Sequence, residues 1–274
     1  MNPFFSRLFD IQKKKKTCLC VGLDPDPARM PAEFGESDGG LFEFCREIAG
    51  ATAEFACAFK PNAAFFEAAG SSGVGQLERL VDYIHETTEN PVILDAKRGD
   101  IGNTARMYAR AAFENMGADA ITVNPYLGTD TLSPFLEYTE KGIFVLCLTS
   151  NPGYSDFEDI RSDGIPLYET VARRLSGMEE SGSIGLVVGA THPEEARRVR
   201  NSAPELPFLM PGIGAQGGDP AVVIDAGTAR SGMPPVVNSS RGIIYAGGGA
   251  DFAEAAHNAA RQTRDKLNQF IDWS

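Results

Sequence analysis

The chain has 274 residues, of which 43% are hydrophobic and 23% charged, with a net charge of −12 and a sequence pI of about 4.8. This composition is typical of a globular protein. The excess of acidic residues argues against nucleic acid or an anionic membrane as a partner, because both require a dense positive field. No stretch approaches the apolar length of a membrane span, and residues 1–16 lack the charge order of a secretory signal. A small anionic ligand, held by a few local basic groups, remains compatible with this charge.

The sequence contains five cysteines, an odd number, and most of them lie within apolar runs. Buried free thiols in a reducing compartment are the simplest interpretation of this pattern. We therefore expect a cytoplasmic protein without structural disulfides.

Short apolar runs alternate with helical patterns along the whole chain. The predicted strands span residues 17–24, 57–62, 91–97, 119–125, 142–150, 182–190, 207–214 and 234–240. Eight strands, each followed by a helical segment and without a linker, predict an α/β fold, a closed (β/α)8 TIM barrel, as a single domain over residues 1–274. A doubly wound open sheet is the alternative, but the first strand ends in GLDPDP and not in a glycine-rich dinucleotide turn.

Two connections after predicted strands are long, residues 24–40 and residues 151–166. Long loops that follow barrel strands usually serve the active-site face. From its length, we expect the 151–166 loop to act as a lid.

Charged side chains gather at the C-terminal ends of the predicted strands, which meet on one face of a parallel barrel. Asp95 and Lys97 are two positions apart in the third strand, so their side chains point the same way. Lys60, in the second strand, reaches the same place. Structural ion pairs do occur inside barrels, but burying several charges is costly and fold stability seldom requires it. The cluster therefore predicts an active site.

Two glycine-rich segments follow the seventh and eighth predicted strands, PGIGAQGG (211–218) and NSSRGII (238–244). Backbone N–H groups near Gly212 and Gly242 at the start of a helix bind phosphate in many barrels. Arg241 adds a bidentate charged donor. Ordinary turn glycines are the alternative interpretation, but two such segments on consecutive strands indicate a phosphate site.

The surroundings of Lys97 indicate its chemistry. Carboxylates on both sides favour its protonated form, whereas a Schiff-base lysine needs the opposite environment. A metal is disfavoured, because Lys60 and Lys97 already neutralise the carboxylates that would bind it. The cluster is therefore suited to stabilising and then protonating a carbanion on a phosphorylated substrate, with no metal or other cofactor.

Residues 95–104, DAKRGDIGNT, resemble the D-x-K-x-x-D-I-[GP]-x-T signature of the orotidine 5′-phosphate decarboxylase family. The resemblance spans almost the whole chain, through GLDPDP, FKPNAAFFE, LTSNPG, PGIGAQGG and NSSRGII, and is closest to the longer bacterial branch (type 2) of the family. It implies decarboxylation of orotidine 5′-monophosphate to uridine 5′-monophosphate and carbon dioxide, in pyrimidine biosynthesis.

The resemblance also implies catalytic roles. Lys97 would protonate C6 of the pyrimidine, and Asp95 would stand near the substrate carboxylate and hold Lys97. Lys60 would contact Asp95 and the ribose. Asp100 and Thr104 would come from the partner subunit, so that a homodimer completes each site.

Further positions would bind the nucleotide. Asp24 would bind a ribose hydroxyl, and Gln216 and Arg241 would hold the phosphate. Ser150 would read the pyrimidine, although the adjacent Thr149 and Asn151 remain alternatives.

Three other functions compete with this interpretation. Magnesium-dependent sugar-phosphate decarboxylases of the same superfamily carry an acid in strand two, where this chain has Lys60. A sugar-phosphate epimerase would want histidines or metal ligands at the strand ends. A non-catalytic phosphate-binding barrel would not need Lys97 between two acids.

Overall fold

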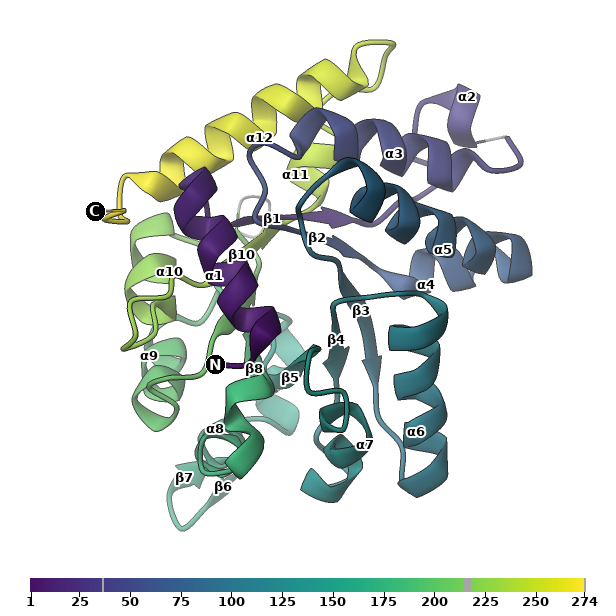
Figure 1. The fold of residues 1–274 in the computed structure, drawn as a ribbon. Coiled ribbons are helices and arrows are strands. Elements are labelled where there is room, and N and C mark those ends of the chain that lie inside the picture. The colour runs from purple at the N-terminus through teal and green to yellow at the C-terminus, as the bar shows by residue number, and fades with distance from the viewer. Residues whose placement is uncertain (36, 214–217, 274) are drawn as a thin grey trace.

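The computed structural model describes residues 1–35, 37–213 and 218–273. Eight strands form one parallel sheet in the order β2-β1-β10-β9-β8-β5-β4-β3 (Figure 1). Their bounds are β1 Leu19–Leu23, β2 Ala58–Pro61, β3 Ile93–Arg98, β4 Ala120–Val123, β5 Gly142–Leu148, β8 Ile184–Val188, β9 Phe208–Pro211 and β10 Val236–Ser239. Each strand lies inside a run that the sequence predicts, except that β3 extends one residue further, to Arg98.

The two ends of this sheet meet and almost close it into a barrel. β2 and β3 are joined by the isolated parallel bridges Phe59↔Val92 and Asn62↔Asp95, in place of a continuous ladder. The predicted TIM barrel is therefore confirmed, and the doubly wound open sheet is wrong.

Helices cover the outside of the barrel (Figure 1). The longer ones are α3 Gly40–Thr52, α5 Gly70–Thr87, α6 Gly102–Arg110, α8 Leu167–Ser176, α9 Pro193–Ser202, α10 Pro220–Gly227 and α12 Phe252–Asn268. The shorter ones are α2 Ala32–Gly35, α4 Ala63–Glu67, α7 Ser133–Leu136 and α11 Arg241–Ile244. Within the described residues, no helix combines the length and hydropathy needed to cross a membrane.

Side chains fill the barrel in layers, because alternate residues of each strand point inward. An apolar layer contains Cys20, Ala58, Ile93, Ala120, Phe144, Val187, Leu209 and Val236. Two positions further along their strands stand Lys60, Asp95, Thr122 and Asn238. The inward-facing surface therefore changes from apolar to polar toward the C-terminal ends of these strands.

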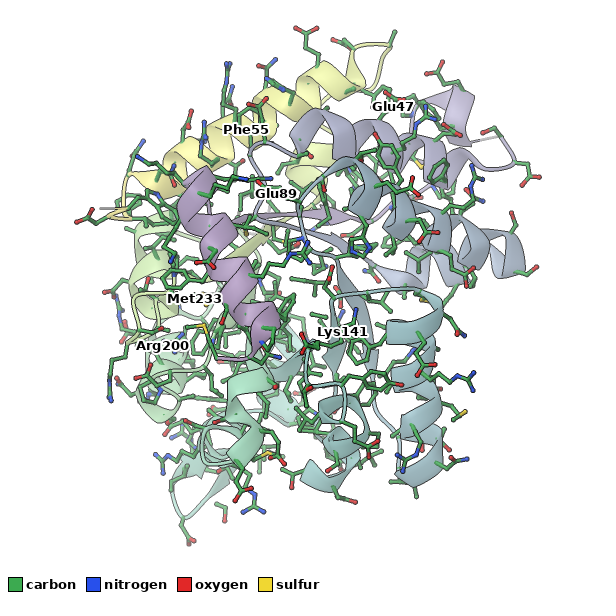
Figure 2. All side chains as sticks on the ribbon, in the orientation of Figure 1. Glu47, Phe55, Glu89, Lys141, Arg200 and Met233 are labelled. Atoms are coloured by element: carbon green, nitrogen blue, oxygen red, sulfur yellow. The ribbon has the colours of Figure 1, made fainter. Side chains whose placement is uncertain are left out.

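Helix α1 (Pro3–Lys15) closes the opposite end of the barrel, and the sequence analysis did not predict it. Asn2 caps the helix by accepting a hydrogen bond from the backbone N–H of Phe5, and Pro3 occupies the first turn. The helix buries four apolar side chains against the apolar layer, and the ring of Phe5 meets that of Phe144 at 5.4 Å. Met233 belongs to the same cluster and lies beside α1 (Figure 2).

The two long loops contain short elements. Residues 24–40 include α2, and residues 151–166 include the one-turn helix η3 (Pro152–Asp156) and a two-strand hairpin of β6 (Arg161–Ser162) and β7 (Ile165–Pro166). All five cysteines are buried and free, as predicted.

Candidate active site

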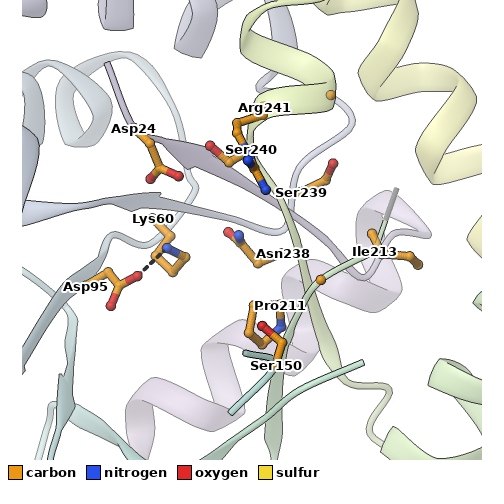
Figure 3. Close-up of a pocket in the computed structure, with 12 residues that line it drawn as sticks. Asp24, Lys60, Asp95, Ser150, Pro211, Ile213, Asn238, Ser239, Ser240 and Arg241 are labelled. Carbon is orange, nitrogen blue, oxygen red and sulfur yellow. Dashed lines mark hydrogen bonds and ion pairs between the residues drawn. The ribbon is translucent and has the colours of Figure 1, made fainter. Parts of the chain in front are cut away.

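The carboxylate of Asp95, near the end of β3, is the centre of a charged cluster. Its Oδ2 accepts a hydrogen bond of 2.6 Å from Lys60 Nζ (Figure 3), and its Oδ1 accepts one of 2.6 Å from Lys97 Nζ. The side chains of Lys60 and Asp95 are only 5% and 11% exposed, whereas that of Lys97 is 50% exposed. The structure thus brings together the three side chains that the sequence places in one cluster, and leaves the amine of Lys97 accessible.

The charges of the buried pair stabilise each other. Burial raises the pKa of Asp95, but the Lys60 and Lys97 ammonium groups lower it by more, so that it lies well below its ordinary value. Burial lowers the pKa of Lys60, but Asp95 and Asp24 raise it by more, so that it lies above its ordinary value. Both groups are therefore charged across the physiological pH range.

Thr122, on β4, holds the backbone that carries Lys97. Its Oγ1 accepts hydrogen bonds from the N–H groups of Ala96 and Lys97, at 3.0 and 2.9 Å, and donates one of 3.0 Å to Asp95 Oδ1. Lys97 has a φ of 48°, and the β3–β4 register shifts between Leu94 and Arg98. A lysine in the left-handed region is costly and persists where its surroundings impose it. Thr122 therefore helps to aim Lys97 into the barrel mouth.

A cavity of about 170 Å³ opens beside the Lys60–Asp95 pair (Figure 3). Its lining contains seven of the predicted site residues, namely Asp24, Lys60, Asp95, Ser150, Gly212, Arg241 and Gly242, together with Pro211, Ile213, Asn238, Ser239 and Ser240. An adjoining cavity of about 230 Å³ shares Lys60, Asp95, Ser150 and Pro211 with it, and adds Lys97, Thr122, Leu146, Thr149, Asn151, Val187 and Leu209. The strand ends thus form two adjoining cavities that share the charged pair in their walls.

One end of the first cavity is suited to an anion. Arg241 and Gly242 begin the short helix α11 directly after β10, and Gly212 follows β9 with a φ of 103°, which favours glycine. Within the described part of the chain, no ion pair involves the Arg241 guanidinium. This group is therefore available to a bound phosphate.

The end of β5 is fixed by Glu158, a residue that the sequence analysis missed. The backbone N–H and the hydroxyl of Thr149 donate hydrogen bonds to its two carboxylate oxygens, each at 2.7 Å. Thr191 Oγ1 donates to the carbonyl of Ser150 at 3.2 Å. Because the hydroxyl proton of Thr149 is already donated, Ser150 is better placed than Thr149 to read a ligand, and it lines both cavities.

The start of the loop after β1 is held by Tyr245. Its hydroxyl donates a hydrogen bond of 2.8 Å to the carbonyl of Asp24 and accepts one of 2.6 Å from the N–H of Asp26. Burial raises the pKa of Tyr245 to about 12, so the hydroxyl keeps its proton at neutral pH. This contact places the Asp24 side chain at the cavity.

The comparisons with known proteins identify the family. The sequence profile of the "Orotidine 5'-phosphate decarboxylase / HUMPS family" matches residues 17–256. The orotidine 5′-phosphate decarboxylase of Ralstonia pickettii is 50% identical over 269 residues, which cover 97% of this chain and 98% of that protein. The protein of the same name from Azoarcus sp. is 51% identical over 269 residues, with 97% and 99% covered. The chain belongs to the orotidine 5′-phosphate decarboxylase / HUMPS family.

A solved member of this family has the same fold. The structure of Leishmania donovani OMP decarboxylase matches with a TM-score of 0.84 and 40% identity, and covers 98% of both chains. The predicted family resemblance is therefore confirmed by sequence and by structure.

Two described residues that the family resemblance assigns to the site do not line these cavities. Asp100 precedes α6 and accepts a hydrogen bond of 2.7 Å from the N–H of Ile101, and Thr104 is exposed in the first turn of α6. Neither lines the two cavities of its own chain, so their assignment to the site depends on a second subunit. Gln216 lies outside the described residues.

Proposed function

We propose that this chain decarboxylates orotidine 5′-monophosphate to uridine 5′-monophosphate and carbon dioxide, in pyrimidine biosynthesis in the cytoplasm. The observation that carries the proposal is the Lys97 ammonium, 2.6 Å from the carboxylate of Asp95 at the second cavity, while the Arg241 guanidinium, without an ion pair among the described residues, lines the adjoining first cavity. We also propose that residues 1–274 act as one domain, without a metal or other cofactor.

The lining residues suggest how the nucleotide binds. Arg241 and the adjacent glycine-rich loops hold the phosphate, and Gln216 joins them. Asp24 and Lys60 contact the ribose. Ser150 contacts the pyrimidine, whose C6 then faces Lys97.

In the proposed reaction, the bond between C6 and the carboxylate carbon breaks and its electron pair stays on C6. Carbon dioxide leaves, and the Lys97 ammonium transfers a proton to C6. The neutral amine takes a proton back from solvent. Neutral carbon dioxide fits the second cavity, where Leu146, Val187 and Leu209 form an apolar wall.

Two effects are available to lower the barrier. Asp95 and the substrate carboxylate about 4 Å apart would repel each other by roughly 4 kcal/mol at an effective dielectric constant near 20. Phosphate binding at Arg241, remote from C6, would offset that repulsion. The preorganised Lys97 ammonium would stabilise the developing carbanion. The hydrogen bonds that Asp95 accepts from Lys60, Lys97 and Thr122 serve both effects, because they fix both charges before substrate binds.

We propose that a homodimer completes the site with Asp100 and Thr104 of the partner. Both residues lie beside an exposed apolar surface, and α6 presents only Ala105 and Ala109 to the barrel. The patch consists of Ile101, Met107, Tyr108, Tyr126 and Leu127. Several large apolar side chains exposed in two neighbouring segments are typical of a protein interface. A dimer that covers α6 would bring the two polar residues to the neighbouring barrel mouth.

The test is absorbance of orotidine 5′-monophosphate mixed with the purified protein, with and without EDTA. We expect the substrate band to disappear at a rate that EDTA does not change. An unchanged band with folded protein would overturn the proposal. A rate abolished by EDTA would overturn the metal-free part of the proposal. An unchanged band would favour the magnesium-dependent sugar-phosphate branch, against which the buried Lys60–Asp95 pair argues.

A further inference from the structure

Three buried polar atoms on the wall of the first cavity have no hydrogen-bond partner among the described residues. They are Asp24 Oδ1, Asn238 Oδ1 and Ser240 Oγ. Leaving a buried polar group unsatisfied costs about 1–3 kcal/mol, so folded proteins rarely do so without a reason. Three such atoms in one cavity indicate groups that a ligand satisfies.

Neither the family resemblance nor the strand-end charges give Asn238 a role. Asn238 is 7% exposed. It lies on β10 and belongs to the polar layer of the barrel, which also contains Lys60 of β2. The neighbouring strand β1 has Gly22 beside it, where a Cβ would lie 3.0 Å from Asn238 Oδ1 and 2.8 Å from the Cβ of Ser240. The glycine therefore leaves the space that the amide occupies.

A second buried asparagine, Asn90, shows the hydrogen bonds that a side-chain amide with a structural role makes in this fold. Asn90 is fully buried at the opposite end of the barrel. Its Nδ2 donates to the carbonyls of Ala53 and Ala56, at 3.2 and 3.0 Å, and its Oδ1 accepts from Lys15 Nζ. Asn238 has no comparable bonds among the described residues, so its amide is not explained by packing of the fold.

We propose that Asn238 Oδ1 accepts a hydrogen bond from a ribose hydroxyl of the bound nucleotide, in addition to the contact proposed for Asp24. The inference rests on the proposed function. A carboxylate and an amide oxygen can only accept, so their ligand must donate. In a nucleoside monophosphate, the ribose hydroxyls lie between phosphate and base. In the view of Figure 3, Asn238 lies between Arg241, assigned to the phosphate, and Ser150, assigned to the base.

The experiment measures calorimetric binding of uridine 5′-monophosphate and of its 2′-deoxy and 3′-deoxy analogues to the full chain. The proteins are the wild type, Asn238→Ala, Asn238→Leu and the matched control Asn90→Ala. We expect the wild type to bind each deoxy analogue roughly tenfold more weakly, the value of one hydrogen bond of this kind, because Asp24 accepts from one ribose hydroxyl and Asn238 from the other. In both Asn238 variants, uridine 5′-monophosphate should bind roughly tenfold more weakly, and the penalty for one of the two analogues should disappear while the other penalty remains.

Thermal unfolding without ligand supplies the second readout. Asn238→Leu should keep or raise the melting temperature, because it removes an unsatisfied buried group. Asn90→Ala should lower the melting temperature and keep the nucleotide affinity and both deoxy penalties.

Several results would overturn the inference. Penalties for both deoxy analogues that persist in the Asn238 variants, or a wild type that binds all three nucleotides equally, would show that Asn238 contacts no hydroxyl. Asn238 variants that lose thermal stability as Asn90→Ala does, with both penalties intact, would make the residue structural. Wild-type turnover is measured separately. If the wild type turns over substrate but both penalties persist in the variants, this inference alone fails; if the wild type shows no turnover and binds no nucleotide, the proposed function fails as well.

Discussion

Lys97 is half exposed while its Nζ stays within 2.6 Å of Asp95, a position suited to moving a proton. We predict that Lys97→Ala lowers kcat by at least roughly 10²–10⁴-fold, the usual contribution of general acid catalysis. The affinity for uridine 5′-monophosphate should change by no more than about tenfold, because the phosphate and ribose contacts remain. Steady-state absorbance and calorimetry measure the two effects.

Lys266→Ala, which changes an exposed lysine of α12, is the control and should leave both quantities unchanged. Substantial decarboxylation by Lys97→Ala would rule out its role as proton donor.

Arg241 is proposed to bind the phosphate of the nucleotide. Arg241→Ala should weaken binding of uridine 5′-monophosphate by roughly 10–100-fold, the value of a hydrogen bond between charged groups. Uridine, which lacks the phosphate, should bind the variant and the wild type equally. Equal losses for both ligands would remove Arg241 from the phosphate site.

At the residue scale, the sequence predicts the charged cluster because strand periodicity and strand ends determine which side chains share a face. It does not predict how Lys97 is held, since the positive φ and the hydrogen bonds that Thr122 Oγ1 accepts from the N–H groups of Ala96 and Lys97 arise only when β3 and β4 pair. Thr122 left a weak signal, a polar residue within an apolar run. Asn238 was visible at a strand end, but its lack of partners is a property of the folded cavity.

Among the elements, α1 is the one whose contribution to stability is easiest to isolate. Phe5 is fully buried in the apolar cluster at the closed end of the barrel. The charged cluster lies at the other end of the strands. We predict that Phe5→Ala lowers the free energy of unfolding by about 3–5 kcal/mol, the usual cost of truncating a buried phenylalanine. The KM and kcat of the folded enzyme should stay within about twofold.

Urea unfolding and steady-state kinetics measure these effects, with Phe270→Ala as the control, because Phe270 is 46% exposed. If the two substitutions cost the same, α1 does not stabilise the barrel.

The elements differ in how far the sequence predicts them. The strands are short apolar runs between helical patterns, so their positions follow from periodicity. Helix α1 has a cap and an apolar face in its sequence, but its partners are the inward side chains of strands distant in the chain. The hairpin of β6 and β7 has only two residues on each side, too few for a sequence pattern. The hydrogen bond from the Thr149 N–H to Glu158 joins residues nine positions apart, and no sequence pattern indicates it.

For the whole molecule, the decisive question is whether two chains share each site. Lys97→Ala and Asp100→Ala should each be nearly inactive as purified dimers. In a mixed dimer of the two, one site contains both changes and the other contains neither. We therefore predict that mixing the two variants under conditions of subunit exchange restores activity, which absorbance measures.

Mixing Lys97→Ala with Arg241→Ala is the matched control, because both residues belong to the same chain's site. In that mixed dimer, the site of one chain lacks Lys97 and the site of the other lacks Arg241, so each site keeps one defect and mixing gives no gain in activity over the two parent variants. Equal recovery in both mixtures, or none in either despite exchange, would contradict the shared site.

The packing of α1 against the barrel also has a consequence for synthesis. The side chain of Gln12 donates to the carbonyl of Pro234, 222 positions later in the chain, just before β10. At a translation rate of about 5–20 residues per second, the emerging helix waits on the order of ten to forty seconds for that partner. Its phenylalanine-rich face is exposed on the ribosome during this interval. The nascent chain therefore offers chaperones a binding segment that the finished enzyme conceals.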